Sequence, residues 1–489
     1  MFKDYAKHDA LGLAEAVRNR VVTAADLLDE AEHRADAAGA VNAIVRRLVP
    51  EQGAGPFAGV PYLLKDLGPA LAGVPLTQGS RHYATYVPSH DDIFVVRLKA
   101  AGLAIFGKTN TPELGQFPYT EPVLHGVCRN PWDLGRTPGG SSGGAAAAVA
   151  VGIVPAAHGN DGGGSIRIPA SCCGLFGMKP SRGRTPGGAD RLAMPGDLNV
   201  DHAITRSVRD SAALLDAVSG SDPALPGDPS APERPYAAEV DAEPGPLRIA
   251  VVRGAMFGRI VHPDCRAALD DAAALLCSLG HTVVDADPVD DYPALARAFL
   301  VLWSVRTAHY TLSAAAITGR TPRRREFEPS SWAMGMINET HPPGALSAAL
   351  ALQTQVTARL TGFMQGYDAI LTPTLAAPPI RIGEQALKAS ERVALEVLAR
   401  MPVKSILQAM LKQMAAPAFG WAAFTPLFNM TGQPAMSVPL HWSAAGLPVG
   451  IQLAGRFAED ATLFRLAGQL ERARPWFDRR PALAAGASP

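Results

Sequence analysis

Residues 135–174 read GRTPGGSSGGAAAAVAVGIVPAAHGNDGGGSIRIPASCCG, and both the fold and the chemistry of the chain depend on this stretch. Two Gly-Ser clusters, at residues 139–144 and 162–167, flank an Ala- and Val-rich segment long enough for one helix and a connection. Glycine at this density indicates backbone that turns sharply or brings its N–H groups close to a ligand. The serines within the clusters, Ser141 and Ser165, are therefore candidate reactive groups.

Helical and extended patterns alternate on both sides of this stretch. Upstream, an apolar strand is predicted to end at Lys65 and Asp66, and Thr111 with Pro112 is predicted to begin a helix. Such alternation favours an α/β fold, in which helices lie on the faces of a sheet. The other elements that we predict are helices at 92–102, 206–220, 263–279 and 459–471, and strands at 103–106, 247–252, 282–286, 368–374, 431–440 and 447–454.

The composition is that of an ordinary globular protein. The chain has 45 basic and 45 acidic residues, so no net charge favours nucleic acid or an anionic membrane as a partner. The five cysteines are scattered and include no CxxC pair, which predicts neither a disulfide framework nor a zinc site. No signal peptide is evident, and the most apolar run, residues 143–157, is too short to span a bilayer. We therefore expect a cytoplasmic protein.

Two interpretations of the serines compete. Residues 139–143, GGSSG, fit the G-x-S-x-G pattern of an α/β-hydrolase, in which Ser141 would be the nucleophile on a strand-to-helix turn. However, no apolar strand precedes this pattern, and none of the 12 histidines stands in a recognisable catalytic context. In the other interpretation Ser141 and Ser165 act with Lys65. Taken alone, Lys65 is equally well explained as a surface lysine with a buried stem.

Longer motifs in a fixed order favour the second interpretation. GVPYLLKD at 59–66, GGSSGG at 139–144 and GGGSIRIPA at 162–170 resemble the amidase signature family of serine hydrolases. The resemblance covers most of the chain. Five further motifs agree with it: GKTNTPELG at 107–115, GLFGMKPSRGR at 174–184, RSVRD at 206–210, YDAILTPT at 367–374 and FNMTGQPAMSVP at 428–439.

The resemblance implies a single α/β domain over residues 1–489, in which helices cover both faces of a central mixed β-sheet. The core motifs span about 55–220, and a second half at about 247–475 completes the sheet and the substrate pocket. It also implies hydrolysis of C–N bonds with no cofactor and no metal. The expected partner is a small-molecule amide, with no nucleic acid and no membrane, and a homodimer is an open alternative.

The same resemblance implies a Ser-cis-Ser-Lys triad. Ser165 would be the nucleophile that forms an acyl-enzyme, Ser141 the bridging serine after a cis peptide bond, and Lys65 the base. Burial disfavours the charged form of a lysine, and this lowers its pKa toward the range in which a base works.

An oxyanion hole and a set of supporting side chains are also implied. The backbone N–H groups expected to form the hole are those of Gly162, Gly163, Gly164 and Ser165. The side chains expected to support the site, rather than to act in catalysis, are Ser142, Asp161 and Arg167. The chain departs from the family at residues 160–165, NDGGGS, where Thr-Asp and one more non-glycine residue usually precede Gly-Gly-Ser. The extra glycine, Gly162, is expected to widen or loosen the acyl side.

Within the family, the segments at 54–67, 120–122, 129–136 and 157–161 are most similar to the 6-aminohexanoate cyclic dimer hydrolases, which open a nylon-derived cyclic amide. The Leu, Met, Trp and Phe content of the segments expected to line the pocket favours apolar amides, lactams or cyclic oligoamides. The alternatives are aryl amides, carbamates (a urethanase-like activity) and the A subunit of a tRNA-dependent amidotransferase.

The pocket is expected to draw on residues 187–203, 300–345 and 400–420. The candidate wall residues in the first segment are Leu192, Ala193 and Met194, for which an ordinary surface loop is an equal alternative. The candidates in or near the other two segments are Trp303, Trp332 and Phe419, although core packing is the favoured role for these side chains.

Overall fold

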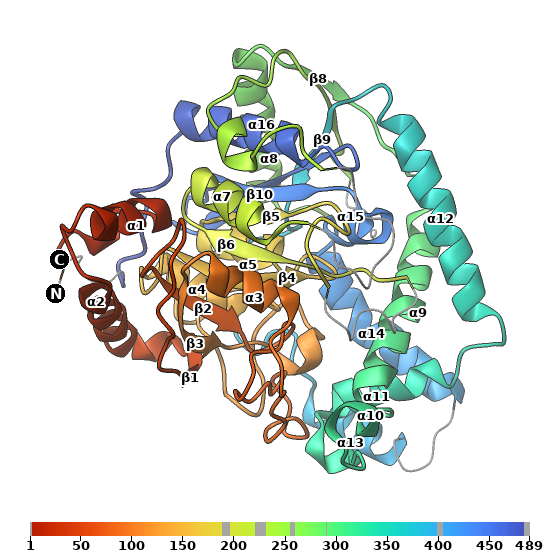
Figure 1. Cartoon of the computed structure of the whole chain (residues 1–489). Helices are drawn as coiled ribbons and strands as arrows, with labels where there is room; N and C mark the ends of the chain where they lie inside the picture. Colours follow the sequence, from red (N-terminus) through yellow and green to blue (C-terminus); the bar gives the residue numbers. More distant parts are fainter. Residues whose placement is uncertain are drawn as a thin grey trace.

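A sheet that contains strands from both halves of the chain lies at the centre of the molecule (Figure 1). The computed structural model describes residues 2–187, 196–220, 231–254, 260–289, 291–398 and 404–483. The strands are β1 (Ile44–Arg47), β2 (Pro61–Lys65), β3 (Ala104–Thr109), β4 (Ala156–Asp161), β5 (Phe176–Lys179), β6 (Val200–Thr205), β7 (Arg248–Val251), β8 (Thr282–Asp285), β9 (Ala369–Pro373), β10 (Ala435–Trp442) and β11 (Pro448–Gly455).

The described residues form one sheet of 11 strands in the order β1-β3-β2-β4-β6-β5-β10-β11-β9-β7-β8. β2 is parallel to β3 and β4, β7 is parallel to β8 and β9, and the other neighbours are antiparallel, so the sheet is mixed. The two halves join where β5 pairs with β10, with Lys179 opposite Ala435. This ladder makes one continuous core out of segments that are more than 200 residues apart.

Helices cover both faces of the sheet, which confirms the predicted α/β class. The α-helices are α1 (Ala10–Arg18), α2 (Ala24–Ala37), α3 (Ile93–Ala100), α4 (Gly143–Ala150), α5 (Arg167–Cys173), α7 (Val208–Val218), α8 (Pro263–Ser278), α9 (Tyr292–Tyr310), α10 (Ala315–Thr318), α11 (Pro329–Asn338), α12 (Ala345–Phe363), α13 (Ala389–Leu398), α14 (Lys404–Trp421), α15 (Pro426–Thr431) and α16 (Asp460–Ala473). The short 3-10 helices are η1 (Tyr5–Lys7), η2 (Gly39–Val41), η3 (Glu113–Gly115), η4 (Tyr236–Glu239) and η5 (Arg324–Glu326).

The Ala-rich segment of the central stretch forms α4, and every residue of that helix is buried. Small side chains let α4 pack closely on β2, β3, β4 and β6 and on its neighbour α5. On another side of the molecule α9, α11, α12 and α14 stand together as a helical wall (Figure 1). The site described below lies between the central stretch and α9. No helix within the described ranges is both long enough and apolar enough to cross a membrane.

Most predicted elements are present, but the helix predicted to begin at Thr111 and Pro112 is wrong. Residues 107–109 extend β3, and only the 3-10 turn η3 follows. Leu114 within that turn has φ +53°, and its N–H donates to the carbonyl oxygen of Gln78. Because an α-helix needs consecutive residues at negative φ, this tertiary hydrogen bond and the left-handed Leu114 prevent the helix.

Two glycines in α-helices give a matched test of the packing. A Cβ atom at Gly468 on α16 would lie 1.9 Å from the carbonyl oxygen of Val240, whereas one at Gly362 on α12 would meet nothing within 4 Å. We expect Gly468→Ala to destabilise the protein by about 1–3 kcal/mol through overpacking. Gly362→Ala should stabilise it by up to about 1 kcal/mol, because alanine favours helix.

Urea denaturation followed by circular dichroism measures both effects as shifts of the unfolding midpoint. If the two alanine variants shifted the midpoint in the same direction, the close approach of α16 to the Val240 segment would be contradicted.

Candidate active site

The carboxyl end of β2 holds a buried lysine. β2 runs parallel to β4, so the carboxyl ends of both strands reach the same edge of the sheet. Lys65 ends β2, and its side chain is 0% exposed, so the surface-lysine alternative is wrong. Its Nζ lies 2.6 Å from Oδ1 of Asn160, which is on β4. The hydroxyl oxygens of Ser141 and Ser142 lie 2.7 and 2.9 Å from the same Nζ.

Ser141 and Ser142 lie directly before α4. Ser142 is the N-cap of the helix, and the peptide bond between Gly140 and Ser141 is cis. A Cβ atom at Gly140 would lie 2.7 Å from the backbone nitrogen of Tyr119, so only glycine allows the two backbones to approach this closely. Residues 137–142 form a loop and not the end of a strand. The strand-to-helix turn that the G-x-S-x-G interpretation requires is therefore missing from this described segment.

Burial lowers the pKa of Lys65 well below its ordinary value, because the charged amine loses its hydration in the interior. Neighbouring charges act in both directions. The carboxylates of Asp201 and Asp161 raise the pKa, and the guanidinium of Arg306 lowers it. Burial is the largest of these effects, so the neutral amine is favoured.

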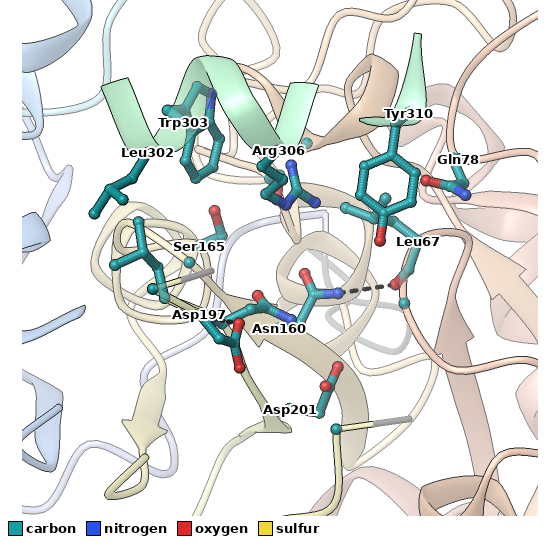
Figure 2. A pocket seen from close by; sticks show the side chains of 18 of the residues that line it. Leu67, Gln78, Asn160, Ser165, Asp197, Asp201, Leu302, Trp303, Arg306 and Tyr310 are labelled. Carbon is teal, nitrogen blue, oxygen red and sulfur yellow. Dashed lines mark hydrogen bonds between the residues drawn. The ribbon is translucent and has the colours of Figure 1, made fainter. Parts of the chain in front are cut away.

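Ser165 lies between β4 and α5, at the meeting point of two cavities. Figure 2 shows the polar cavity, where Trp303, Arg306 and Tyr310 project from α9 above Ser165 and Asn160. Among the described residues, the Ser165 hydroxyl has no hydrogen-bond partner. It is therefore free to turn toward a ligand or toward a neighbouring group.

The glycine loop at residues 162–164 provides fewer free N–H groups than the sequence predicted. The N–H of Gly164 donates to Oδ1 of Asp161 at 2.7 Å, so its hydrogen is already engaged. This contact removes Gly164 from the candidate oxyanion donors. Within the described part of the chain, the N–H groups of Gly162, Gly163 and Ser165 have no acceptor.

An aromatic pair covers this glycine loop. The rings of Phe299 and Trp303 are stacked, with centroids 5.4 Å apart. A Cβ atom at Gly162 would lie 3.4 Å from the indole of Trp303, and one at Gly163 would lie 3.1 Å from the ring of Phe299. A Cβ atom at Gly162 would thus make only ordinary contact with the indole, and the expectation that this glycine widens the acyl side stays a prediction.

Two of the three aromatic candidates line the apolar cavity beside Ser165. Trp303 and Phe419 are in its wall, and both also pack against the main hydrophobic core, so each has the two roles that the sequence left open. The indole N–H of Trp303 donates to Oε1 of Gln116 at 2.8 Å, so the ring is held in place. Trp332 lies in the wall of a different groove. The three candidates from the loop segment, Leu192, Ala193 and Met194, lie outside the described residues.

A buried ion pair holds the glycine loop. The side chains of Asp161 and Arg167 are both 0% exposed, and the guanidinium donates Nε–H and Nη2–H to the two carboxylate oxygens at 2.9 Å each. The other guanidinium N–H groups donate to Asn429, Gln452 and the carbonyl oxygen of Thr425. All five donors of the arginine are thus used, as a buried guanidinium requires.

The pKa of Asp161 reflects this setting. Burial raises it, but the charge and hydrogen bonds of Arg167 lower it more, and a hydrogen bond from Asn429 adds to that effect. The net pKa lies far below the ordinary value, so the carboxylate is ionised and both partners hold the loop.

Sequence reasoning missed four polar residues around Lys65. Asn160 and His158 lie within the central stretch, but the motif analysis assigned no role to either side chain. Nδ1 of His158 accepts the backbone N–H of Lys65 at 3.3 Å, and its Nε2 lies 3.2 Å from Oδ1 of Asp201. The imidazole is therefore the tautomer that donates Nε2–H. Arg306 comes from a segment without a motif, and only the packing of α9 brings it to the site.

Burial also lowers the pKa of His158, so it stays a neutral orienting group. Among the described residues, no group of three or more His, Cys, Asp or Glu side chains is arranged to hold a metal ion.

The ion pair at the glycine loop yields a test of stability. Arg167→Met removes one partner and leaves the Asp161 carboxylate buried without its countercharge, which should cost about 3–5 kcal/mol. Arg47→Met is the matched control, because Arg47 pairs with Asp36 at the surface, where both side chains are exposed. That change should cost at most about 1 kcal/mol.

Chemical denaturation of the two variants gives the comparison. Equal destabilisation by both changes would contradict the structural role of the buried pair.

The chain matches the Amidase family over residues 10–464. The 6-aminohexanoate-cyclic-dimer hydrolase of Paenarthrobacter ureafaciens is 38% identical, over 97% of this chain and 96% of its own length. A solved structure of 6-aminohexanoate cyclic dimer hydrolase has a TM-score of 0.86 and 35% identity, and covers 98% of this chain and 99% of that one. A bacterial aryl acylamidase of the amidase signature family has a TM-score of 0.84 and 25% identity, with 98% of both chains covered.

These matches confirm the resemblance to the family and to its 6-aminohexanoate cyclic dimer hydrolase subgroup. The similarity extends over nearly the whole chain, including the central stretch and the segments that pack around it. The chain therefore belongs to the amidase signature family and is a hydrolase that acts on amide bonds.

Proposed function

We propose that the protein hydrolyses apolar amides, lactams or cyclic oligoamides through an acyl-enzyme on Ser165, with Ser141 as proton relay and Lys65 as base. The observation that carries this proposal is the set of three oxygen atoms within 2.9 Å of the buried Lys65 Nζ. Their hydrogen-bonding capacities determine where the lone pair of the amine points.

A neutral amine has two N–H donors and one lone pair. Oδ1 of Asn160 can only accept, and the amide is oriented by its Nδ2–H, which donates to the carbonyl oxygen of Leu67. The Ser142 hydroxyl donates to the carbonyl oxygen of Asn160 at 3.3 Å, so it too accepts from the lysine. Both N–H groups are thereby used. The lone pair is left for the hydroxyl hydrogen of Ser141, 2.7 Å away between heavy atoms.

The reaction follows from this direction of proton flow. The Ser165 oxygen attacks the amide carbon while its proton passes to the Ser141 oxygen and the Ser141 proton passes to Lys65. The tetrahedral oxyanion is stabilised by N–H groups of Gly162, Gly163 and Ser165. The protons return along the same path to the leaving amine. Water then attacks the acyl carbon while its proton passes through Ser141 to Lys65, and a proton returns through Ser141 to the Ser165 oxygen as the acid is released.

The walls beside Ser165 support an apolar substrate. One cavity is built from Phe117, Ile168, Phe299, Trp303 and Phe419 among others, so an aliphatic or aromatic group fits it better than a charged one. Aryl amides are a second candidate class, favoured by this aromatic lining and by the similarity to a bacterial aryl acylamidase.

Serine and lysine variants test the roles. Ser165→Ala and Lys65→Ala should each lower kcat by about 10⁴-fold or more, because triad members act as a unit. Ser278→Ala, an exposed change on α8, should leave kcat unchanged. A hydrolysis panel of linear apolar amides, lactams, cyclic oligoamides, aryl amides and carbamates supplies the substrates.

Retention of wild-type turnover by Ser165→Ala on any accepted amide would exclude Ser165 as the nucleophile. Activity confined to glutamine-type amides would instead contradict the apolar substrate class.

The pH dependence tests the base. Lys65 accepts a proton only when neutral, so kcat/KM should be retained above its lowered pKa and lost as the pH falls through it. Asp201→Asn removes an anion that raises this pKa, and should therefore shift the acid limb to lower pH. Arg306→Gln removes a cation that lowers it, and should shift the acid limb to higher pH.

The measurement is kcat/KM over a pH series for the wild type and both variants on one amide. An acid limb at the same pH in all three enzymes would contradict Lys65 as the titrating base.

A further inference from the structure

A groove of about 720 Å³ adjoins the apolar cavity beside Ser165, and the two spaces share part of their walls. The side chains that line both spaces are Phe117, Ser330 and Ala418, which we call the neck. The groove lies between the segment after η3 and the helices α11, α13 and α14. The groove therefore lies next to the apolar cavity, with the neck between it and Ser165.

The inner part of the groove is aromatic. Phe117 and Tyr119 are stacked with ring centroids 5.0 Å apart, and Trp332 and Pro417 also line the space. Flat, apolar walls of this kind bind methylene chains or rings. The part nearest the neck is thus suited to an apolar linker that joins the scissile amide to a more distant group.

The outer part of the groove is charged, but its acidic groups are already engaged. Each of its five glutamates has a partner. Four of them accept a hydrogen bond from a backbone N–H group: Glu121 from Gly383, Glu328 from Val123, Glu384 from Arg381 and Glu391 from Lys388. The fifth, Glu396, forms an ion pair with the side chain of Arg324. Burial also raises the pKa of Glu121 and of Glu328.

Two cationic side chains of the groove, unlike these glutamates, have no partner among the described residues. Arg325 and Lys388 are exposed, and neither side chain makes a hydrogen bond or ion pair within the described residues. Their donors are therefore open to an acidic group of a ligand. A carboxylate is the matching group, because it can accept from both an ammonium and a guanidinium.

We propose that this groove extends the substrate site and receives the long arm of an elongated amide that ends in a carboxylate, which Arg325 and Lys388 bind. The inference rests on the proposed hydrolysis at Ser165. It adds a substrate class: amides that carry an apolar linker and a terminal acid.

Four substrates that share one scissile amide test the proposal. One has a short apolar arm, and three have long arms that end in a carboxylate, a methyl ester or an ammonium group. The wild type should show a kcat/KM about tenfold higher for the carboxylate-ended arm than for its methyl ester, the size expected of a charge-assisted hydrogen bond.

Variants of the two cations sharpen the test. Arg325→Gln combined with Lys388→Gln should remove this preference and leave kcat/KM for the short-armed amide unchanged. Arg325→Glu combined with Lys388→Glu should reverse it, so that the ammonium-ended arm is preferred. Arg323→Gln is the matched control, because this exposed arginine lies two residues before Arg325 and outside the groove lining.

The outcomes separate the two proposals. Hydrolysis of the short-armed amide that persists in Ser165→Ala would overturn the proposed function. Hydrolysis that requires Ser165 but shows equal kcat/KM for the carboxylate and ester arms, or a preference unchanged in the double glutamine variant, would overturn the groove proposal alone.

Discussion

The amine of Lys65, fully buried at the end of β2, constrains the arrangement of the polar groups around it. An amine in such a place must be neutral or fully hydrogen-bonded, and here three oxygen atoms from two different segments surround it. Two of them come from the loop before α4 and the third from β4. The central sheet brings these segments together, because β2 and β4 are parallel neighbours with their carboxyl ends at one edge.

A buried ion pair, Asp161 with Arg167, holds the glycine loop in place on the other side of Ser165. Asp161 accepts a hydrogen bond from the glycine loop, and Arg167 donates to three residues between 425 and 452. The pair therefore connects the first half of the chain to the second half beneath Ser165. This pair explains why the loop can present unengaged N–H groups without collapsing. A loop of three glycines has little conformational preference of its own, and the ion pair supplies the missing constraint.

The site is also asymmetric. Ser165 lines a polar cavity together with Arg306, and it also lines an apolar cavity that shares the residues of the neck with the groove. In the proposed mechanism the polar cavity holds the groups that transfer protons, and the apolar cavity binds the substrate. Trp303 lines both cavities, and its hydrogen bond to Gln116 holds the indole at the boundary.

Local periodicity was enough to predict the α/β class and most strands and helices. The motifs indicated the family, and the resemblance implied the pairing of Lys65 with Ser141 and of Asp161 with Arg167. The sequence did not determine that Gly164 is engaged by Asp161, that Leu114 breaks a predicted helix, or that Arg306 and Trp303 reach the site. Those features depend on contacts between segments far apart in the chain. These segments come together only when α9 packs over the site and the two halves of the sheet pair. A local sequence pattern contains no information about such contacts.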